Sequence, residues 1–271
     1  MAASVVTMQS VVTVVQARTG SSRLPRKILL PLGGKTVLEQ MLERVARARL
    51  SGVVVVATTH QAQDDPIEAL ARRAGVLCYR GDPLDLLDRH YQVARALNAA
   101  HVVKIPSDCP LIDPEVIDRV IGAYLDGPRR DYVSNLHPPT YPDGNDVEIC
   151  SFAALSTAWR LARRPSDREH TTPFLWRHPE AFRLGNVVWE AGLDLSESHR
   201  VVLDYPEDYE LIRRVFDALA VERLDFGVRD VARFLDEHPA IAAINARHRG
   251  SQWYRRQDAD RAAALLEGAP Q

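Results

Sequence analysis

The stretch that organises the chain reads Val11-Val-Thr-Val-Val15, followed by Gln16-Ala-Arg-Thr-Gly-Ser-Ser-Arg-Leu-Pro-Arg-Lys27. Its first five residues are all β-branched, which predicts a buried strand. A polar, cationic loop follows this strand, and apolar residues recur at helical spacing from Thr36 onward. A strand, a loop and a helix in this order are typical of parallel α/β sheets, which bind ligands beside the carboxyl ends of their strands.

The loop has the composition of a phosphate-binding segment. Its small residues leave room for backbone N–H groups to approach phosphate oxygens, and its basic side chains supply the charge that a polyphosphate requires. An ordinary solvated loop is the alternative, but small and basic residues together favour nucleotide phosphates. The P-loop pattern is excluded, because no Gly-Lys-Ser/Thr sequence opens a helix here. The small residues are Gly20, Ser21 and Ser22, and the basic ones are Arg18, Arg23 and Lys27.

The composition is that of an ordinary globular protein. With 271 residues, 46% of them hydrophobic and 26% charged, the chain is long enough for one large α/β domain. Its net charge of −2 argues against nucleic acid and anionic membranes as partners. No apolar run is long enough to span a bilayer, and residues 1–10 lack the pattern of a signal peptide. The widely spaced cysteines fit neither a metal site nor a disulfide framework, so we expect a cytoplasmic protein.

Apolar runs alternate with amphipathic segments through the first half of the chain. Each run is short, and each amphipathic segment has apolar residues at helical spacing. This alternation predicts one open, mostly parallel sheet with helices on both of its faces. After the strand at Val11–Val15, the expected strands are Val53–Ala57, Val76–Tyr79 and His101–Ile105, and the expected helices are Thr36–Leu50, Ile67–Ala74 and Leu84–Leu97.

Prolines between residues 127 and 144 interrupt this alternation. We interpret the interruption as the change, within a single domain spanning residues 9–249, from a nucleotide-binding half (9–126) to an acceptor-binding half (127–249). Residues 1–8 and 250–271 are expected to be flexible ends. In the second half, the expected strands are Asp146–Cys150, Arg183–Trp189 and Arg200–Leu203, and the expected helices are Ser151–Ala162, Asp167–Trp176, Pro206–Ala220 and Val228–His248.

Two aspartates follow apolar strands and are expected at the edge of the sheet that carries the cationic loop. Asp108 comes soon after the strand His101–Ile105, and Asp204 directly follows the apolar run Val201–Leu203. Mg²⁺ on nucleotides takes one or two carboxylates together with phosphate oxygens, so this pair predicts a magnesium–triphosphate site. The structural alternatives are a turn cap before Pro110 for Asp108 and a helix N-cap for Asp204.

Charged residues of the second half are candidates for binding an acceptor. Asp146 and Glu148 alternate along an expected strand, so both can face one side and bind hydroxyl groups or a second Mg²⁺. A solvated strand face is the alternative. Arg168, Glu169 and His170 stand at the start of an expected helix, where Arg168 can clamp an acceptor carboxylate or phosphate through two hydrogen bonds.

Five blocks of the chain carry a family pattern. They are Arg18-Thr-Gly-Ser-Ser-Arg-Leu-Pro-Arg-Lys27, Lys104-Ile-Pro-Ser-Asp-Cys-Pro-Leu-Ile-Asp113, Tyr141-Pro-Asp-Gly-Asn-Asp-Val-Glu148, Asp167-Arg-Glu-His-Thr-Thr-Pro173 and Leu203-Asp-Tyr-Pro-Glu-Asp-Tyr209. In this order they resemble the sugar cytidylyltransferases, the group that holds the spore coat polysaccharide protein F family and the CMP-Kdo synthetases. The resemblance covers most of the chain and is far more specific than any single motif.

The resemblance implies a single-domain fold of the nucleotide-diphosphosugar transferase kind, similar to the GT-A fold, often as a homodimer. It implies Mg²⁺ as cofactor, held by Asp108 and Asp204, and transfer of CMP from CTP to a sugar or sugar-like acceptor with release of pyrophosphate. Such a reaction belongs to cell-surface glycan or secondary-metabolite biosynthesis. The resemblance also places Gly81 and Arg89 at the nucleotide, and its implied catalytic set is Lys27, Arg18, Asp108 and Asp204.

The chain departs from the family pattern at four positions, which are Arg26, Lys104, Ser107 and Asn145. Arg26 stands where the family has Gly, so either the loop avoids a positive φ there or an extra cation faces the triphosphate or the acceptor. Lys104 and Ser107 can retune the nucleotide pocket, and Asn145, in place of a bulky apolar residue, leaves the acceptor open. The open alternatives are another nucleoside triphosphate, a cyclitol or phosphonate acceptor, and a CTP-binding subunit without catalysis.

Overall fold

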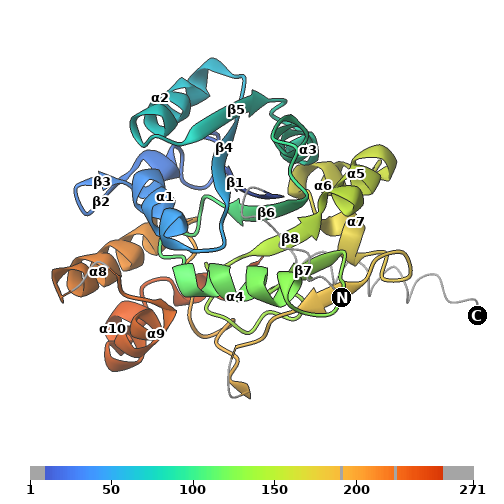
Figure 1. Cartoon of the computed structure of the whole chain (residues 1–271). Helices are drawn as coiled ribbons and strands as arrows, with labels where there is room; N and C mark the ends of the chain where they lie inside the picture. The colour runs from blue at the N-terminus through green and yellow to red at the C-terminus, as the bar shows by residue number, and fades with distance from the viewer. Residues whose placement is uncertain (1–9, 190–191, 223–224, 253–271) are drawn as a thin grey trace, which may run out of the picture.

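The computed structural model describes residues 10–189, 192–222 and 225–252, and a seven-stranded sheet forms its centre (Figure 1). The strands of this sheet are β1 (Val11–Gln16), β4 (Val53–Thr59), β5 (Leu77–Gly81), β6 (His101–Pro106), β7 (Tyr132–Ser134), β8 (Glu148–Ser151) and β9 (Leu184–Asn186). Their spatial order is β5-β4-β1-β6-β8-β7-β9. The strands from β5 to β6 are parallel, whereas β8 is antiparallel to both of its neighbours. The sheet is therefore mostly parallel, as the sequence predicts.

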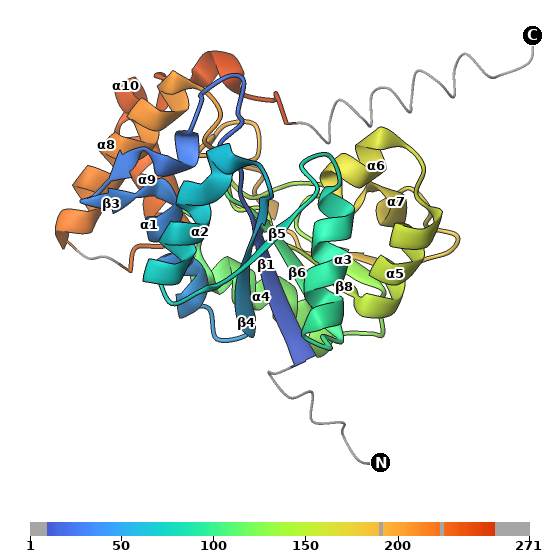
Figure 2. The ribbon, with the colours of Figure 1, turned by 90° about the horizontal axis from the view of Figure 1, so that it is seen from above.

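Helices cover both faces of this sheet (Figure 2). The helices of the described residues are α1 (Val37–Arg47), α2 (Asp65–Arg73), α3 (Leu86–Ala96), α4 (Pro114–Leu125), α5 (Phe152–Leu161), α6 (Pro165–His170), α7 (Pro173–Trp176), α8 (Pro206–Glu222), α9 (Val228–Glu237) and α10 (Pro239–Ala242). Successive residues of β1 point to opposite faces. Val11 and Val15 pack with α1, α2 and α4, while Val12 and Val14 pack with α3, α5 and α7.

A third apolar core lies outside the two faces of the sheet. It joins α8 and α9 to a small hairpin of β2 (Pro31–Leu32) and β3 (Lys35–Thr36). α1 begins directly after this hairpin, where Thr36 and Glu39 form a capping box. Neither this hairpin nor β7 was predicted from the sequence, because strands of two or three residues carry too little periodicity to be recognised. Helix α4 was not predicted either.

Two expected helices are interrupted in the structure. The segment Asp167–Trp176 is not one helix but two, α6 and α7, because Thr171 between them has a φ of 72° in the left-handed region. The segment Val228–His248 is likewise not one helix. There α9 ends before Pro239, whose missing N–H cannot continue the hydrogen-bond ladder, and α10 begins at that proline.

Other differences concern the edges of the predicted elements. The expected strand Asp146–Cys150 begins only at Glu148 as β8. The expected strand Arg200–Leu203 is not a strand, because it makes only one isolated bridge, between Arg200 and Asp143. Of the two expected flexible ends, residues 1–8 and 253–271 lie outside the described residues. Within the described part of the chain, no helix is both long enough and apolar enough to cross a membrane.

The strand order brings the predicted site together. β1 and β6 are adjacent and parallel, so the loop that follows β1 and Asp108, which follows β6, lie at one edge of the sheet. The backbone N–H of Leu203 donates to the carbonyl of Asp108 over 2.8 Å. This hydrogen bond fixes Asp204, the next residue, at the same edge.

Candidate active site

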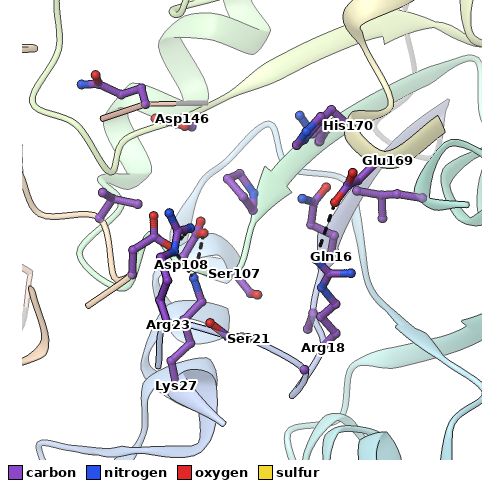
Figure 3. A pocket seen from close by; sticks show the side chains of 18 of the residues that line it. Gln16, Arg18, Ser21, Arg23, Lys27, Ser107, Asp108, Asp146, Glu169 and His170 are labelled. Atoms are coloured by element: carbon purple, nitrogen blue, oxygen red, sulfur yellow. Dashed lines mark hydrogen bonds and ion pairs between the residues drawn. The ribbon is translucent and has the colours of Figure 1, made fainter. Parts of the chain in front are cut away.

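A cavity of about 540 Å³ opens at this edge of the sheet, a size typical of small-ligand sites. The cationic loop after β1 and the end of β6 line one side of it, and residues from the second half of the chain line the other. Figure 3 shows Arg23, Lys27 and Asp108 close together, with Arg18 and Glu169 in a separate group. Predicted residues that lie far apart in the sequence therefore meet in one cavity.

Lys27 holds the two predicted metal ligands together. Its Nζ lies 3.1 Å from Asp108 Oδ2 and 2.9 Å from Asp204 Oδ1, and it donates to the carbonyl of Leu203 over 2.7 Å. Burial opposes the charged ammonium, but the two carboxylates outweigh it and raise the pKa of Lys27. Burial also opposes the charge of Asp204, yet Lys27 and its cationic neighbours lower the pKa of that carboxyl. Lys27 and Asp204 are therefore both charged at neutral pH.

Arg23 extends this cluster toward the cavity. Its guanidinium forms an ion pair with Asp204 over 2.9 Å and lies 5.1 Å from the centre of the Tyr205 ring. The side chain stays 40% exposed, so it can reach a ligand in the cavity.

Arg26, two residues beyond Leu24, is exposed and does not line the cavity. Its φ of 58° is positive, so the expectation that Arg replaces Gly because the loop avoids a positive φ is wrong.

The carboxylates of Asp108 and Asp204 fit a magnesium ion that shares its ligands with a phosphate. Both converge on a single ammonium group, so their oxygens come within reach of one cation. Among the described residues no group of three or more His, Cys, Asp or Glu side chains forms a complete metal site. A pair of carboxylates is what Mg²⁺ uses on nucleotides, where phosphate oxygens and water complete its shell. The capping alternative for Asp204 is not observed, since Asp208 accepts from the N–H groups of both Asp204 and Tyr205.

The structure brings most of the predicted nucleotide-binding residues into the cavity. Gly81 is the exception: it lies against Arg89, where an added Cβ would come 2.7 Å from Arg89 Cγ. Arg89 is buried, its Nε has no partner, and burial lowers its pKa to about 10. Gly81 thus makes room for a cation at the cavity wall. The predicted residues that line the cavity are Arg18, Gly20, Ser21, Ser22, Arg23, Lys27, Arg89 and Asp108.

Four of the five predicted acceptor-binding residues also line the cavity, namely Asp146, Glu148, Glu169 and His170. Arg168 does not. Its Nε donates to Asp85, the residue that caps α3, over 2.9 Å, and its NH1 group donates to the carbonyl of Trp159 over 2.8 Å. Arg168 therefore joins α6 to α3 and α5 instead of clamping an acceptor. The prediction missed this because Asp85 is far away in the sequence.

Glu148 belongs to a buried polar cluster at the back of the cavity. It forms an ion pair with Lys104 and accepts a hydrogen bond from the Tyr132 hydroxyl over 2.6 Å. Burial opposes its charge, but Lys104 outweighs this and lowers the pKa of Glu148. Burial lowers the pKa of the neighbouring His170 to about 4, so its imidazole is neutral at pH 7. The solvated strand face that was the alternative for Glu148 is thereby excluded.

Arg200, which is buried and lines the cavity, was not predicted from the sequence. Its guanidinium donates two hydrogen bonds of 2.9 Å to Asp208 and one of 2.9 Å to Asp143. Burial nevertheless raises the pKa of Asp143 to about 7. Burial and neighbouring carboxylates raise the pKa of Asp146 as well. One feature of the sequence could have identified Arg200 as a candidate: it directly precedes a buried apolar run, where a charged residue requires a partner.

Comparison with known proteins decides the family. The cytidylyltransferase family model matches residues 12–228. The chain belongs to the cytidylyltransferase family. It is therefore an enzyme of the class that its five sequence blocks resemble, and its fold is the nucleotidyltransferase fold predicted from them.

Three relatives share almost the whole length of this cytidylyltransferase. MJ1063, an uncharacterized protein of Methanocaldococcus jannaschii, is 34% identical over 87% of this chain and 94% of its own. The spore coat polysaccharide biosynthesis protein SpsF of Bacillus subtilis is 29% identical over 87% of this chain and 98% of its own. The structure of a cytidylyltransferase from Leptospira borgpetersenii superposes with a TM-score of 0.81 at 32% identity, covering 86% of this chain and 96% of that one.

Proposed function

We propose that this cytidylyltransferase transfers CMP from CTP to a sugar-like acceptor, releases pyrophosphate, and uses Mg²⁺ bound by Asp108 and Asp204. The observation that carries the proposal is the contact of Lys27 Nζ with both carboxylates in a cavity walled by Arg18 and Arg23. The family supports cytidylyl transfer, and the name of the Bacillus relative supports a sugar acceptor.

The residues on either side of the cavity suit such a transfer. The hydroxyl oxygen of the acceptor attacks the α-phosphorus and its proton passes to solvent, while the bond from that phosphorus to the bridging β-phosphate oxygen breaks and pyrophosphate leaves. Lys27 stabilises the charge that builds on the α-phosphate, and Arg18 and Arg23 hold the departing pyrophosphate. Bound Mg²⁺ would neutralise phosphate charge in the same place. Because no covalent intermediate with the protein is needed, catalysis consists of positioning and charge neutralisation.

In this proposal, the two halves of the chain bind different substrates. Residues 9–126 bind the nucleotide through the loop after β1, and residues 127–249 bind the acceptor. The homodimer and the cytoplasmic location implied by the sequence analysis stay predictions. Sedimentation and cell fractionation measure them.

Pyrophosphate release tests the proposal directly. With Mg²⁺, CTP should raise the melting temperature more than UTP, GTP or ATP does, and pyrophosphate should form when a suitable sugar is added. Mass spectrometry of products from CTP and a sugar panel identifies the CMP-linked product. Asp108→Asn should lower pyrophosphate release by about a hundredfold, because a charged ligand of the proposed metal is lost. Asp217→Asn, which removes a carboxylate from the exposed side of α8, is the matched control and should have no effect.

The same assay separates the enzyme from a CTP-binding subunit. A chain that binds CTP tightly but forms neither pyrophosphate nor a CMP-linked product with any acceptor would refute catalysis. Turnover that survives Asp108→Asn would refute the role given to that carboxylate.

A further inference from the structure

The segment that follows α10 returns to the edge of the sheet that holds the candidate active site. A short 3-10 helix, Ala246–His248, comes after α10, and Ser251 and Gln252 line the cavity. Ser251 Oγ accepts a hydrogen bond from the Arg200 guanidinium over 3.3 Å. The family model matches the chain only as far as residue 228, so this part of the cavity wall lies beyond the matched residues.

Asn245 ties this segment to the turn that carries Asp204. Its side chain is fully buried, and Nδ2 donates to the carbonyl of Arg200 over 3.0 Å and to Asp208 Oδ1 over 2.8 Å. The other oxygen of the Asp208 carboxylate accepts from the N–H groups of Asp204 and Tyr205. Asn245 therefore helps to fix the backbone of this turn.

His248 holds the same turn through the ring of Tyr205. The imidazole stacks on that ring with 3.8 Å between the ring centres and 3° between the ring planes. Its Nε2 lies 3.2 Å from Glu207 Oε2 at the start of α8, and only 15% of the side chain is exposed. The Arg23 guanidinium lies 5.1 Å from the centre of the same Tyr205 ring. The segment after α10 thus supports a ring that contacts a cation of the loop after β1.

These contacts determine how well Arg23 is positioned before a ligand binds. An arginine side chain has several rotatable bonds, and fixing them on binding costs free energy unless the protein has already ordered them. The ion pair with Asp204 and the ring of Tyr205 both order this guanidinium. In the proposed function Asp204 is also a metal ligand, so its charge is shared with Mg²⁺, whereas the contact with the ring uses no carboxylate. The Tyr205 ring is therefore the support that Arg23 keeps when the metal is bound.

We propose that Tyr205 and His248 are positioning residues for the triphosphate: His248 fixes the ring of Tyr205, and this ring directs Arg23 into the cavity. The inference rests on the proposed function, since that proposal assigns Arg23 to the departing pyrophosphate. A purely structural role is the alternative. In that case His248 only secures the start of α8 through Glu207, and its loss acts on the whole fold and not through Arg23.

A double-mutant cycle separates these two roles, because the effects of residues that act through each other are not additive. A CTP analogue that cannot be cleaved is titrated with Mg²⁺ into the full chain by calorimetry, for wild type, His248→Ala, Arg23→Ala and the double variant. His248→Ala should weaken binding about fivefold, the effect of one side chain that must now be ordered on binding. In the Arg23→Ala background, the same change should have no further effect.

Further variants identify the contact that matters. His248→Phe keeps a ring that can stack on Tyr205 but removes the contact with Glu207, so it should bind the analogue as the wild type does. Tyr205→Leu removes the ring and should weaken binding as much as His248→Ala, which keeps the test decisive if His248→Ala does not fold. His238→Ala is the matched control and should leave the affinity unchanged, because His238 stacks on Phe234 over 4.1 Å but is exposed and does not line the cavity.

The outcomes distinguish this inference from the proposed function. An unchanged affinity in His248→Ala or Tyr205→Leu, or an equal loss with and without Arg23, would overturn the inference. A loss in His248→Phe as large as that in His248→Ala would overturn it too, because the stacked ring would then not be what matters. If the wild type itself does not bind the analogue, the proposed function fails instead.

Discussion

Replacing Lys27 by Met tests the electrostatic core of the site. The substitution keeps the length of the side chain but removes an ammonium that contacts Asp108 and Asp204 over 3.1 and 2.9 Å. Those carboxylates are only 28% and 15% exposed, so water replaces the lost partner poorly. Removing one member of a buried ion pair costs roughly 3–5 kcal/mol. Arg23 still holds Asp204, so we expect a loss of about 3 kcal/mol in the free energy of unfolding.

The dependence on pH and metal makes this prediction specific. The pKa of Asp204 is lowered in the folded chain, so its stabilising pairing is present above the ordinary value of 3.8 and is lost as the pH falls through the folded value. The difference between wild type and Lys27→Met should therefore be full at pH 7.5 and shrink only below about pH 4. Mg²⁺ should stabilise the variant more than the wild type, because the two carboxylates then lack their ammonium.

Urea unfolding at several pH values, with EDTA or with Mg²⁺, measures these differences. Lys35→Met is the matched control. Lys35 pairs with Glu43 where both side chains are nearly half exposed, and its loss should change stability by less than about 0.5 kcal/mol. Pyrophosphate release should fall by about a hundredfold in Lys27→Met alone. Equal stability of wild type and Lys27→Met at pH 7.5, or retained turnover, would refute the reasoning.

Three further predictions concern the surroundings of the site. Arg26→Gly should stabilise the chain by about 0.5–1 kcal/mol in urea unfolding, because Arg26 has a φ of 58° that favours glycine. Gly81→Ala should weaken CTP binding about tenfold in calorimetry, since its Cβ would displace the side chain of Arg89, and an unchanged affinity would contradict this. Burial lowers the pKa of His90 to about 3, below its ordinary 6.5, so below pH 6.5 the unfolded chain binds the proton that the folded chain excludes. Stability should thus rise by about 1.4 kcal/mol per pH unit between about 3 and 6.5, and His90→Leu should remove that part of the slope.

The sequence predicted the elements that carry strong local signals. Strand β1 follows from five consecutive β-branched residues, and the loop after it follows from its small and basic residues. Because parallel strands all end at one edge of a sheet, Asp108 could be placed beside this loop without knowing any side-chain contact. Lys27, Asp108 and Asp204 do meet there, as predicted.

The features that could not be predicted depend on contacts between distant residues. Arg168 was expected at the acceptor, but Asp85, 83 residues earlier, binds it elsewhere. The break between α6 and α7 depends on the backbone of Thr171, a residue type that does not usually adopt a positive φ. Helix α4, in contrast, could have been predicted from the sequence, because Val116, Val120 and Ile121 recur at helical spacing before the prolines.

Arg200 explains why the two sides of the cavity form one unit. Its guanidinium holds Asp208, and Asp208 in turn accepts from the N–H of Asp204, which fixes one proposed metal ligand. Another nitrogen of the same guanidinium holds Asp143, three residues before Asp146 on the acceptor side. One buried cation therefore positions both the segment proposed to bind the metal and the segment proposed to bind the acceptor. A shift of either segment would break a buried ion pair, so the distance between the proposed nucleotide and acceptor sites is set by a contact in the interior of the protein.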